Sequence, residues 1–361
     1  MVNLFNTLPS HRFRHVVICL TDYTNFRQRI TAQQVDFYAL HKAPGHDFGW
    51  VPRLWKLLRR LKPDLVHTRN LSALEAQFVA AAAGIRNTVH SEHGRDVFDL
   101  HGQSRKYTFL RRAAQPFVSQ YIAVSRDLAG WLRDTVRVPE RKIRHIYNGV
   151  DCEKFHPRRA FSDTASRRPV LPDGFAPKDS MVFGSVGRMA EVKDYPTLTR
   201  AFIQMLRQHP EARRRARLVI VGEGVARKPC LKLLTDAGVA ELAWLPGERD
   251  DIAEILRTFN VFVLPSLNEG ISNTLLEAQA SALPVIATRV GGNVELVEDD
   301  VNGRLVAPAD VSGMAQALLS DMGEVAPLAE QGARARQRVL DHFSIPAMAD
   351  AYTRVYEQVL R

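Results

Sequence analysis

Short apolar runs alternate with segments of helical periodicity in two stretches of the chain, residues 15–150 and 181–342. This alternation predicts buried parallel strands joined by helices, and therefore an α/β sheet in each stretch. The expected strands span residues 15–20, 35–40, 64–67, 87–91, 121–124 and 143–147 in the first stretch, and 182–186, 217–221, 242–245, 261–264 and 284–287 in the second.

Helical periodicity and its loss divide the chain further. Helices are expected at residues 71–83, 126–134, 195–208 and 250–258, and over the tail from 314 to 361 apart from a break at 344–346. Residues 155–180 lose periodicity and are rich in Pro, Arg, Asp and Ser, which is typical of a linker. We therefore expect a first domain over residues 1–160, a linker over 161–180, a second domain over 181–342 and a C-terminal helix over 343–361.

Length and composition agree with two folded domains. The 361 residues are ample for two buried cores, and the hydrophobic content of 45% is ordinary for a folded soluble protein. Three cysteines, Cys19, Cys152 and Cys230, match no metal-ligand spacing and are expected to be reduced. No apolar run approaches the roughly 18 residues of a membrane span, and no signal-peptide pattern opens the chain. These features predict a cytoplasmic protein.

The net charge of +10 predicts attraction to anions, whether nucleic acid, an anionic membrane or a phosphorylated acceptor. The basic excess gathers in residues 53–62, 105–112 and 213–217. The first run has leucines at helical spacing and predicts an amphipathic basic helix, which suits either a solvated face over a core or a membrane surface. Nucleic-acid binding has no aromatic and basic motif to support it.

The segment from Pro265 to Val306 carries the most chemical information. A buried strand ends at Pro265, and apolar spacing turns helical from Ile271, which predicts a strand, a loop and a helix N-terminus. The amides of such a terminus favour an anion. Glu269 lies in the loop and Glu277 about two turns into the helix, where it can accept a hydrogen bond from a sugar hydroxyl. A phosphate site flanked by two carboxylates suits a sugar nucleotide.

This E-x7-E segment, followed by ALPVIATRVGGNVELVEDDVNGRLV, resembles the donor half of retaining glycosyltransferases of family GT4. The resemblance implies the GT-B fold, an α/β architecture of two Rossmann-like domains facing across a cleft, with the last helix crossing back to the first domain. It also implies transfer of a hexosyl unit from a nucleotide diphosphate sugar. Glu269 would contact the sugar, Glu277 the ribose, and the amides of Ile271, Ser272, Asn273 and Thr274 the diphosphate.

The predicted strand that ends at Val186 leads into GRMAEVKDYPTL. Gly187 permits close approach of a ligand, and Arg188 and Lys193 place two cations where a diphosphate leaving group gains charge. The matching pair in GT4 enzymes acts as the electrophilic catalyst, so neither a metal nor another cofactor is expected. Turns containing Glu223 and Gly224, and Gly247 after the next strand, are expected to approach the nucleotide.

Two clusters in the first stretch are candidates for the acceptor side. His93, in SEHGRD, follows a predicted strand and resembles the GT4 histidine near the donor sugar, so it joins Arg188, Lys193 and Glu269 as a catalytic candidate. His67, Arg69 and Asn70, in VHTRN, also close a strand and are acceptor candidates.

One departure from the GT4 pattern concerns the start of the first domain. GT4 chains open with a strand and a Gly-rich loop, and MVNLFNTL resembles the helix that follows them. A sheet without this central strand would leave two strand edges unpaired. We expect a late gene start, the alternative being a damaged product that no longer turns over.

The phrases LVHTRNLSALEAQ and HSEHGRDVFDLHGQSRKY resemble glycosyltransferases of bacterial PEP-CTERM/exosortase systems, which help to make exopolysaccharide. That narrower resemblance implies a lipid-linked acceptor at the inner face of the cytoplasmic membrane and a peripheral contact with it. A non-catalytic GT-B scaffold protein of a polysaccharide-synthesis complex and a UDP-sugar epimerase remain as alternatives.

Overall fold

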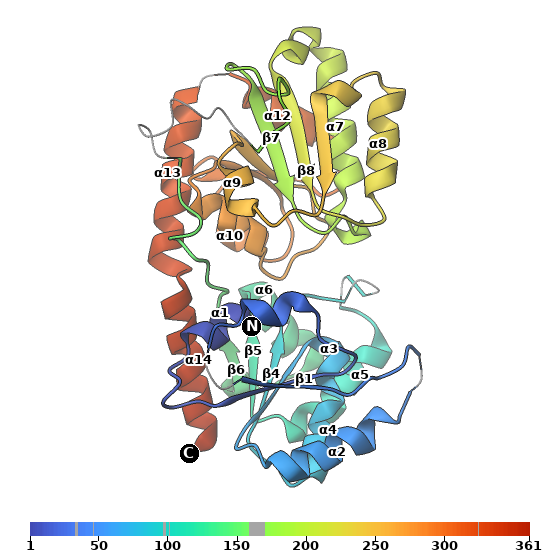
Figure 1. Ribbon diagram of the computed structural model, residues 1–361, viewed down its shortest axis with the longest axis vertical. Coiled ribbons are helices and arrows are strands. Elements are labelled where there is room, and N and C mark those ends of the chain that lie inside the picture. Colours follow the sequence, from blue (N-terminus) through green and yellow to red (C-terminus); the bar gives the residue numbers. More distant parts are fainter. Residues whose placement is uncertain (33–34, 46, 97–98, 101, 159–169, 324) are drawn as a thin grey trace. The chain divides into compact units, whose positions relative to one another are not determined.

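The computed structural model describes the chain from residue 1 to 361 except residues 33–34, 46, 97–98, 101, 159–169 and 324 (Figure 1). The chain divides into two compact units. The first comprises residues 1–149 and 345–361, and the second residues 150–344. The last helix, α14 (Ile345–Leu360), therefore belongs to the same unit as the N-terminal residues.

The second unit contains one parallel sheet of six strands in the order β12-β11-β10-β7-β8-β9. β7 is central, its successors β8 and β9 extend to one side, and β10 begins again on the other side of β7. The strand order thus reverses between β7 and β10, which is where ligands bind in open α/β sheets. The strands are β7 (Met181–Val186), β8 (Ala216–Val221), β9 (Ala243–Gly247), β10 (Val261–Leu264), β11 (Val285–Thr288) and β12 (Gly303–Val306).

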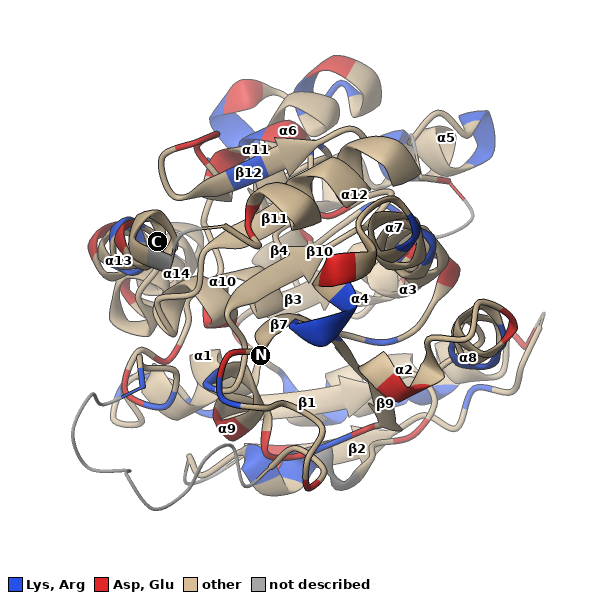
Figure 2. Cartoon of the chain, turned by 90° about the horizontal axis from the view of Figure 1, so that it is seen from above, with Lys and Arg blue, Asp and Glu red and all other residues tan. Residues whose placement is uncertain are grey.

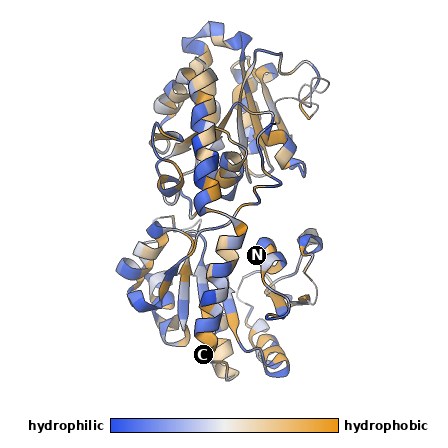
Figure 3. Ribbon diagram, turned by 90° about the vertical axis from the view of Figure 1, so that its left-hand side faces the viewer, coloured by the Kyte–Doolittle hydropathy of each residue, from blue (hydrophilic) through white to orange (hydrophobic). Residues whose placement is uncertain are grey.

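Helices cover this sheet and share its core. Phe183 on β7, Phe202 on α7 and Leu318 on α12 belong to one cluster of buried side chains, and hydrophobic residues gather along the strands and inner helix faces (Figure 3). Burial of these apolar side chains is the main force that holds the unit together. The helices are α7 (Tyr195–Gln208), α8 (Arg227–Asp236), α9 (Ile252–Leu256), α10 (Asn273–Ala280), α11 (Asn293–Leu296), α12 (Val311–Ser320) and α13 (Val325–His342).

The first unit contains two separate parallel sheets. One has the order β3-β4-β5-β6 and the other pairs β1 with β2. Among the described residues no strand lies between β1 and β3, so each has one edge without a strand partner. This is the arrangement expected of a sheet that lacks its central strand. The strands are β1 (His15–Cys19), β2 (Val35–Ala39), β3 (Val66–Arg69), β4 (Thr88–Glu92), β5 (Gln120–Ala123) and β6 (Ile143–His145).

Helices on the two sheets bury separate clusters. α1 and α14 pack on the four-stranded sheet through a cluster that contains Leu4, Ile122 and Tyr352. α2 and α4 share a second cluster, which contains Leu54 and Val79. The helices are α1 (Val2–Thr7), α2 (Trp50–Leu61), α3 (Asn70–Leu74), α4 (Ala76–Ala82), α5 (Arg105–Ala114), α6 (Arg126–Trp131) and α14.

The structure differs from the sequence-based expectation at several places. The helix expected over residues 71–83 is interrupted at Glu75, β12 was not expected, and the C-terminal tail has a further break after Ser320. Residues 150–158 pack with the second unit, where Arg336 donates to the carbonyl oxygen of Phe155 (3.2 Å). Much of the expected linker falls on residues 159–169, outside the described residues. In the part of the chain that the structure describes, no helix is both long and apolar enough to cross a bilayer.

Candidate active site

An ion pair between Lys193 and Glu269 lies where the strand order of the second unit reverses. Lys193 follows β7 and Glu269 follows β10, and Lys193 Nζ is 2.5 Å from Glu269 Oε1. Ser266 Oγ donates to the same carboxylate oxygen at 2.6 Å. The side chain of Lys193 is 19% exposed and that of Glu269 is 10% exposed. The structure thus brings together two of the residues that the sequence predicted for catalysis.

Two glycines that the sequence interpretation left without a role hold the Glu269 loop in place. A Cβ added to Gly291 would lie 1.9 Å from the carbonyl oxygen of Glu269, and one on Gly292 would lie 2.0 Å from that of Gly270. Gly292 N also donates to Glu269 O at 3.1 Å. The available signal was the Gly-Gly pair just after a predicted strand, a position that permits close approach of two backbone segments.

Helix α10 begins a few residues after Glu269 in the sequence. Ser272 is its N-cap, and its Oγ accepts a hydrogen bond from Leu275 N at 3.3 Å. Because Ser272 keeps an extended backbone, the helix begins at Asn273 rather than at Ile271 as expected. Glu277 consequently lies about one turn into the helix and not two. The first-turn amides of α10 point outward, as at any helix start.

Glu277 is the most strongly perturbed carboxyl group of this region. Burial raises its pKa from 4.5 to about 7, and the nearby positive charge of Lys154 acts in the opposite direction. The side chain therefore changes its protonation state close to neutral pH. Such a carboxyl group at the carboxyl edge of a parallel sheet is a candidate for ligand binding.

The side chain of Arg188 is exposed and forms no ion pair or hydrogen bond with the residues that the structure describes. Its loop is fixed by backbone contacts with the turn after β8. A Cβ on Gly222 would lie 2.0 Å from Gly187 O, and one on Gly224 would lie 2.5 Å from Met189 O. The predicted glycines therefore serve first to let two backbone turns approach each other.

The turn after β9 joins the same edge. Gly222 N donates to Gly247 O at 2.8 Å, and Gly247 has a φ of +87°, a conformation that favours glycine. Glu223 is exposed, and its Oε2 lies 3.7 Å from Arg227 Nε. The structure thus places the predicted donor residues Gly187, Glu223, Gly224 and Gly247 on adjoining turns.

The candidates in the first unit also lie together, at the carboxyl edge of β3 and β4. Both strands end later than expected, so Arg69 is the last residue of β3 and His93 follows Glu92. Arg69 Nη2 donates to His93 Nδ1 at 2.9 Å. Asn70 Oδ1 accepts from the backbone N–H of His93 at 2.9 Å.

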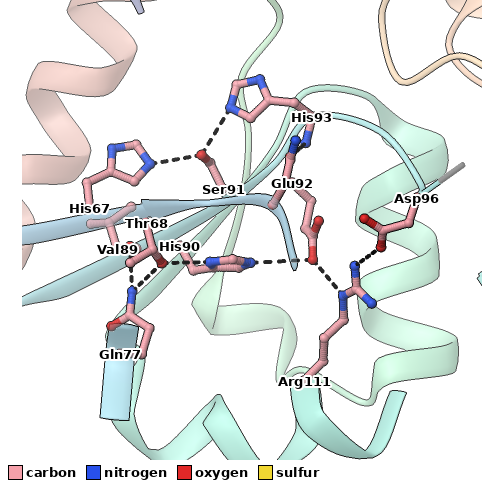
Figure 4. A network of polar contacts seen from close by, with 11 residues as sticks. His67, Thr68, Gln77, Val89, His90, Ser91, Glu92, His93, Asp96 and Arg111 are labelled. Carbon is pink, nitrogen blue, oxygen red and sulfur yellow. Dashed lines mark hydrogen bonds and ion pairs between the residues drawn. The ribbon is translucent and has the colours of Figure 1, made fainter. Parts of the chain in front are cut away.

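Figure 4 draws the hydrogen bonds that link His93, Ser91 and His67, and the chemistry of the groups gives their direction. Because arginine has only donors, His93 Nδ1 accepts from Arg69, and His93 Nε2 donates to Ser91 Oγ at 3.0 Å. Ser91 then donates to His67 Nε2 at 2.9 Å, and His67 Nδ1 donates to Tyr356 Oη at 2.8 Å. Both ring nitrogens of His93 are thus occupied within the protein. The tautomers follow from this assignment of the bonds.

Both histidines are held neutral. Burial, with the charges of neighbouring groups, lowers the pKa of His67 from 6.5 to about 3. Burial and then the positive charge of Arg69 keep the pKa of His93 well below 6.5. A neutral His93 is consistent with its role as an acceptor of the Arg69 hydrogen bond.

Next to this cluster, the buried Arg111 forms ion pairs with Glu92 and Asp96 (Figure 4). Arg111 Nε donates to Glu92 at 2.7 Å, and its Nη2 donates to Asp96 at 3.0 Å. Burial alone would raise the pKa of Glu92, but His90 and Arg111 together hold it below its usual value. Although Arg111 belongs to the basic run 105–112, it is buried and neutralised rather than part of a charged surface. Among the described residues, no group of three His, Cys, Asp or Glu side chains is placed to hold a metal ion.

Models of known protein families match residues in both units. The family model described as "Glycosyltransferase Family 4" matches residues 1–154, and the one described as "Glycosyl transferases group 1" matches residues 180–322. The UDP-Gal:alpha-D-GlcNAc-diphosphoundecaprenol alpha-1,3-galactosyltransferase of Escherichia coli is 28% identical over 98% of this chain and 91% of its own length. The N-acetyl-alpha-D-glucosaminyl L-malate synthase of Bacillus anthracis is 24% identical over 91% of this chain and 83% of its own.

Solved structures share the fold over almost the whole chain. HepE from Anabaena, in complex with UDP and glucose, has a TM-score of 0.81 at 20% identity and covers 98% of this chain and 93% of its own. A glycosyltransferase from Rickettsia africae also has a TM-score of 0.81, at 18% identity, and covers 100% and 94%. The fold is GT-B, as the sequence predicted.

The fold and both family matches define a glycosyltransferase that uses a nucleotide sugar as donor. The chain is a glycosyltransferase of the group 1, or family 4, type.

Proposed function

We propose that the protein transfers a hexosyl unit, with retention of configuration, from a UDP-sugar to a hydroxyl group of a lipid-linked saccharide. The observation that carries this proposal is the Lys193–Glu269 ion pair at the point where the strand order reverses. A lysine there can stabilise the departing diphosphate, and its carboxylate partner can bind the hydroxyls of the sugar.

Each donor residue has a role in this mechanism. Arg188, Lys193 and the first-turn amides of α10 stabilise the charge that develops on the diphosphate when the glycosidic bond breaks. Glu277 accepts from the ribose hydroxyls, and Glu269 binds the sugar ring. The acceptor hydroxyl attacks the face that the leaving group vacates, and a phosphate oxygen takes its proton. No metal enters the mechanism, because the two cations supply the positive charge.

The donor and acceptor classes rest on relatives. The Escherichia coli relative is named for UDP-Gal and a diphosphoundecaprenol acceptor, and HepE was solved with UDP and glucose. We extend a UDP-sugar donor and a lipid diphosphate acceptor to this chain. We further propose that the reaction serves exopolysaccharide synthesis at the inner face of the cytoplasmic membrane, and the segments of the first unit that resemble PEP-CTERM/exosortase glycosyltransferases support this.

A lipid-linked acceptor calls for a surface that meets the bilayer, and α2 has suitable chemistry. It carries four Lys or Arg and no acidic residue, and α5 carries three exposed basic residues besides the buried Arg111 (Figure 2). Trp55 of α2 is 41% exposed, and with Pro52, Phe78 and neighbouring apolar side chains it lines an apolar hollow of about 360 Å³. Basic and aromatic side chains on one amphipathic helix favour an anionic membrane surface.

Vesicle flotation tests this contact. The protein should bind vesicles that contain phosphatidylglycerol and not vesicles of phosphatidylcholine alone. Replacing Lys56 and Arg59 with Gln should weaken binding, whereas replacing the exposed Lys232 and Arg213 of the second unit should not. Equal binding of the two double variants would contradict the assignment to α2.

The activity itself is tested with purified protein, a panel of UDP-, GDP- and ADP-sugars and a lipid diphosphate saccharide. We expect release of UDP together with a glycosylated lipid, unchanged after treatment with a chelator. The anomeric proton of the product, measured by NMR, should show the α configuration of the donor. An inverted product or a requirement for a metal would contradict this mechanism, and epimerised donor without transfer would favour an epimerase.

A further inference from the structure

The positively charged side chain of Arg69 is largely shielded from solvent. No carboxylate among the described residues forms an ion pair with it. Its one side-chain hydrogen bond is the donation from Nη2 to the neutral His93, and it forms no ion pair with a described residue. Its Nε is buried and has no hydrogen-bond partner there. Burial lowers the pKa of this guanidinium, and the hydroxyls of Tyr352 and Tyr356 offset only part of that effect.

Several other partly buried arginines among the described residues have negatively charged or carbonyl partners. Arg111 binds two carboxylates, Arg95 lies 2.9 Å from a carboxylate oxygen of Asp127, and Arg336 donates to backbone carbonyl oxygens. A buried charge is strongly unfavourable unless it is paired and hydrogen-bonded. Arg69 differs from these arginines in that its side-chain partner among the described residues is a neutral imidazole rather than a carboxylate or a carbonyl oxygen.

The position of Arg69 in the sheet indicates that its partner is a bound ligand. It lies at the carboxyl edge of β3, the edge at which α/β sheets bind ligands. Asn70 adopts a left-handed φ of +56°, which asparagine tolerates better than most residues, and its side chain accepts from the backbone of His93. His93 in turn holds one arm of the guanidinium. Hydrogen bonds from neighbouring residues thus fix a cation at the edge where α/β sheets bind ligands.

We propose that Arg69 binds a phosphate group of the acceptor, with His93 as a positioning residue that holds the guanidinium in place. The proposal deepens and rests on the glycosyltransferase function proposed above. A guanidinium matches the geometry of phosphate oxygens, and its unused donors then gain acceptors. An anion would also supply the counter-charge that the described residues lack.

Thermal unfolding separates this role from a structural one. Arg69→Gln removes a charge that has no carboxylate partner, so its unfolding temperature should equal or exceed that of the wild type. Arg111→Gln instead leaves the buried Glu92 without its main partner and should lower the unfolding temperature. A loss for Arg69→Gln as large as that for Arg111→Gln, or failure to fold, would overturn the proposal.

Binding of inorganic pyrophosphate gives the second test, performed with saturating UDP so that the donor site is occupied. Pyrophosphate should raise the unfolding temperature of the wild type and of Arg14→Gln, a matched control whose exposed arginine pairs with Asp36. It should not raise that of Arg69→Gln. No shift in the wild type, the same shift in Arg69→Gln, or an equal shift with malonate would each overturn the phosphate assignment.

UDP alone should stabilise all of these proteins. If it does not, the donor assignment fails, while the difference between wild type and Arg69→Gln in pyrophosphate still decides the role of Arg69. With the lipid diphosphate acceptor, Arg69→Gln should raise the acceptor KM about 10- to 100-fold, as expected for the loss of a charged hydrogen bond. Its UDP affinity should not change, and Arg69→Lys should restore part of the acceptor affinity. A KM unchanged from the wild type would contradict the proposal.

Discussion

Lys193 Nζ and Glu269 Oε1 lie 2.5 Å apart, although 76 positions separate the two residues in the sequence. The pair joins the segment after β7 to the loop after β10, and Leu267 N donates to Val192 O at 2.8 Å beside it. A diphosphate that binds at Lys193 has to compete with this carboxylate. We therefore expect the two residues to affect the binding of UDP in opposite directions.

Substitution at this pair should separate the two effects. Lys193→Ala should lower kcat/KM by about 10²- to 10³-fold, the usual loss for one preorganised donor. Glu269→Gln should lower kcat, because the sugar loses its contact, yet should bind UDP at least as tightly as the wild type. Calorimetry with UDP and steady-state kinetics measure both. Lys232→Ala removes an exposed lysine of the same unit, paired with Asp236, and is the control. Weaker UDP binding by Glu269→Gln would show that the carboxylate does not compete.

The raised pKa of Glu277 predicts a stability that depends on pH. A carboxyl group with a pKa of about 7 in the folded protein and 4.5 when unfolded stabilises the fold fully below pH 4.5, and this contribution is lost as pH rises through 7. The difference corresponds to about 3 kcal/mol. Glu277→Gln should therefore be more stable than the wild type at pH 8 and similar to it near pH 4.5. Urea denaturation at the two pH values measures this.

Donor binding by Glu277 should follow the opposite trend. The carboxylate accepts ribose hydroxyls better than the neutral acid, so UDP affinity of the wild type should increase between pH 6 and 8. Glu277→Ala and Glu277→Gln should bind UDP about 10-fold more weakly, as for the loss of one hydrogen bond to a charged group. The pH trend should disappear in both variants. Donor binding unchanged in Glu277→Ala would remove the residue from the donor site.

Gly291 should prove essential for the position of Glu269. Gly291→Ala introduces a Cβ that overlaps the Glu269 carbonyl oxygen, so the loop must move and kcat/KM should fall at least about 10-fold. Gly238 has a similarly positive φ of +63° and nothing within 4 Å of its Cβ position. Gly238→Ala is thus a control for backbone strain alone, which costs about 1 kcal/mol. Equal activity of the two variants would contradict a positioning role.

The Arg111–Glu92 pair should dominate the electrostatic contribution to the stability of the first unit. Arg111→Gln leaves a buried carboxylate with only His90 as partner and should lower the free energy of unfolding by about 3–5 kcal/mol. Lys232→Gln breaks an exposed pair and should change it by less than about 1 kcal/mol. Urea denaturation of both variants checks this. A loss below about 1 kcal/mol for Arg111→Gln would mean that Glu92 becomes protonated or solvated at little cost.

The sequence predicted parallel strands in each unit and most residues at the carboxyl edge of the six-stranded sheet, because strand ends of a parallel sheet meet at that edge. It did not predict that Lys193 and Glu269 form an ion pair, since a pairing across two loops depends on side-chain conformations. It also gave no role to Gly291, because close approach of two backbones is visible only in three dimensions. The start of α10 was placed at Ile271 since apolar spacing does not distinguish an N-cap from the first helical residue.

Arg111 shows a further limit of the sequence. A run of basic residues predicts a charged surface, but one member of the run 105–112 turns inward to bind Glu92 and Asp96. Those partners lie 19 and 15 positions away, and no local pattern indicates them. Arg69 is the reverse case, since the sequence placed it at a strand end but could not show that no described residue supplies its counter-charge.

The division of the first unit into two sheets affects how this unit opens in solution. Backbone hydrogen bonds between strands stop at the facing edges of β1 and β3, so side-chain packing, as in the α2–α4 cluster, carries the connection between the two sheets. Amide protons of β1 and β2 should therefore exchange with deuterium faster than those of β4 and β5, through local openings that leave the larger sheet intact. The polar cluster around Arg69 and His93 belongs to the slowly exchanging part, and is expected to keep its geometry while the smaller sheet opens and closes.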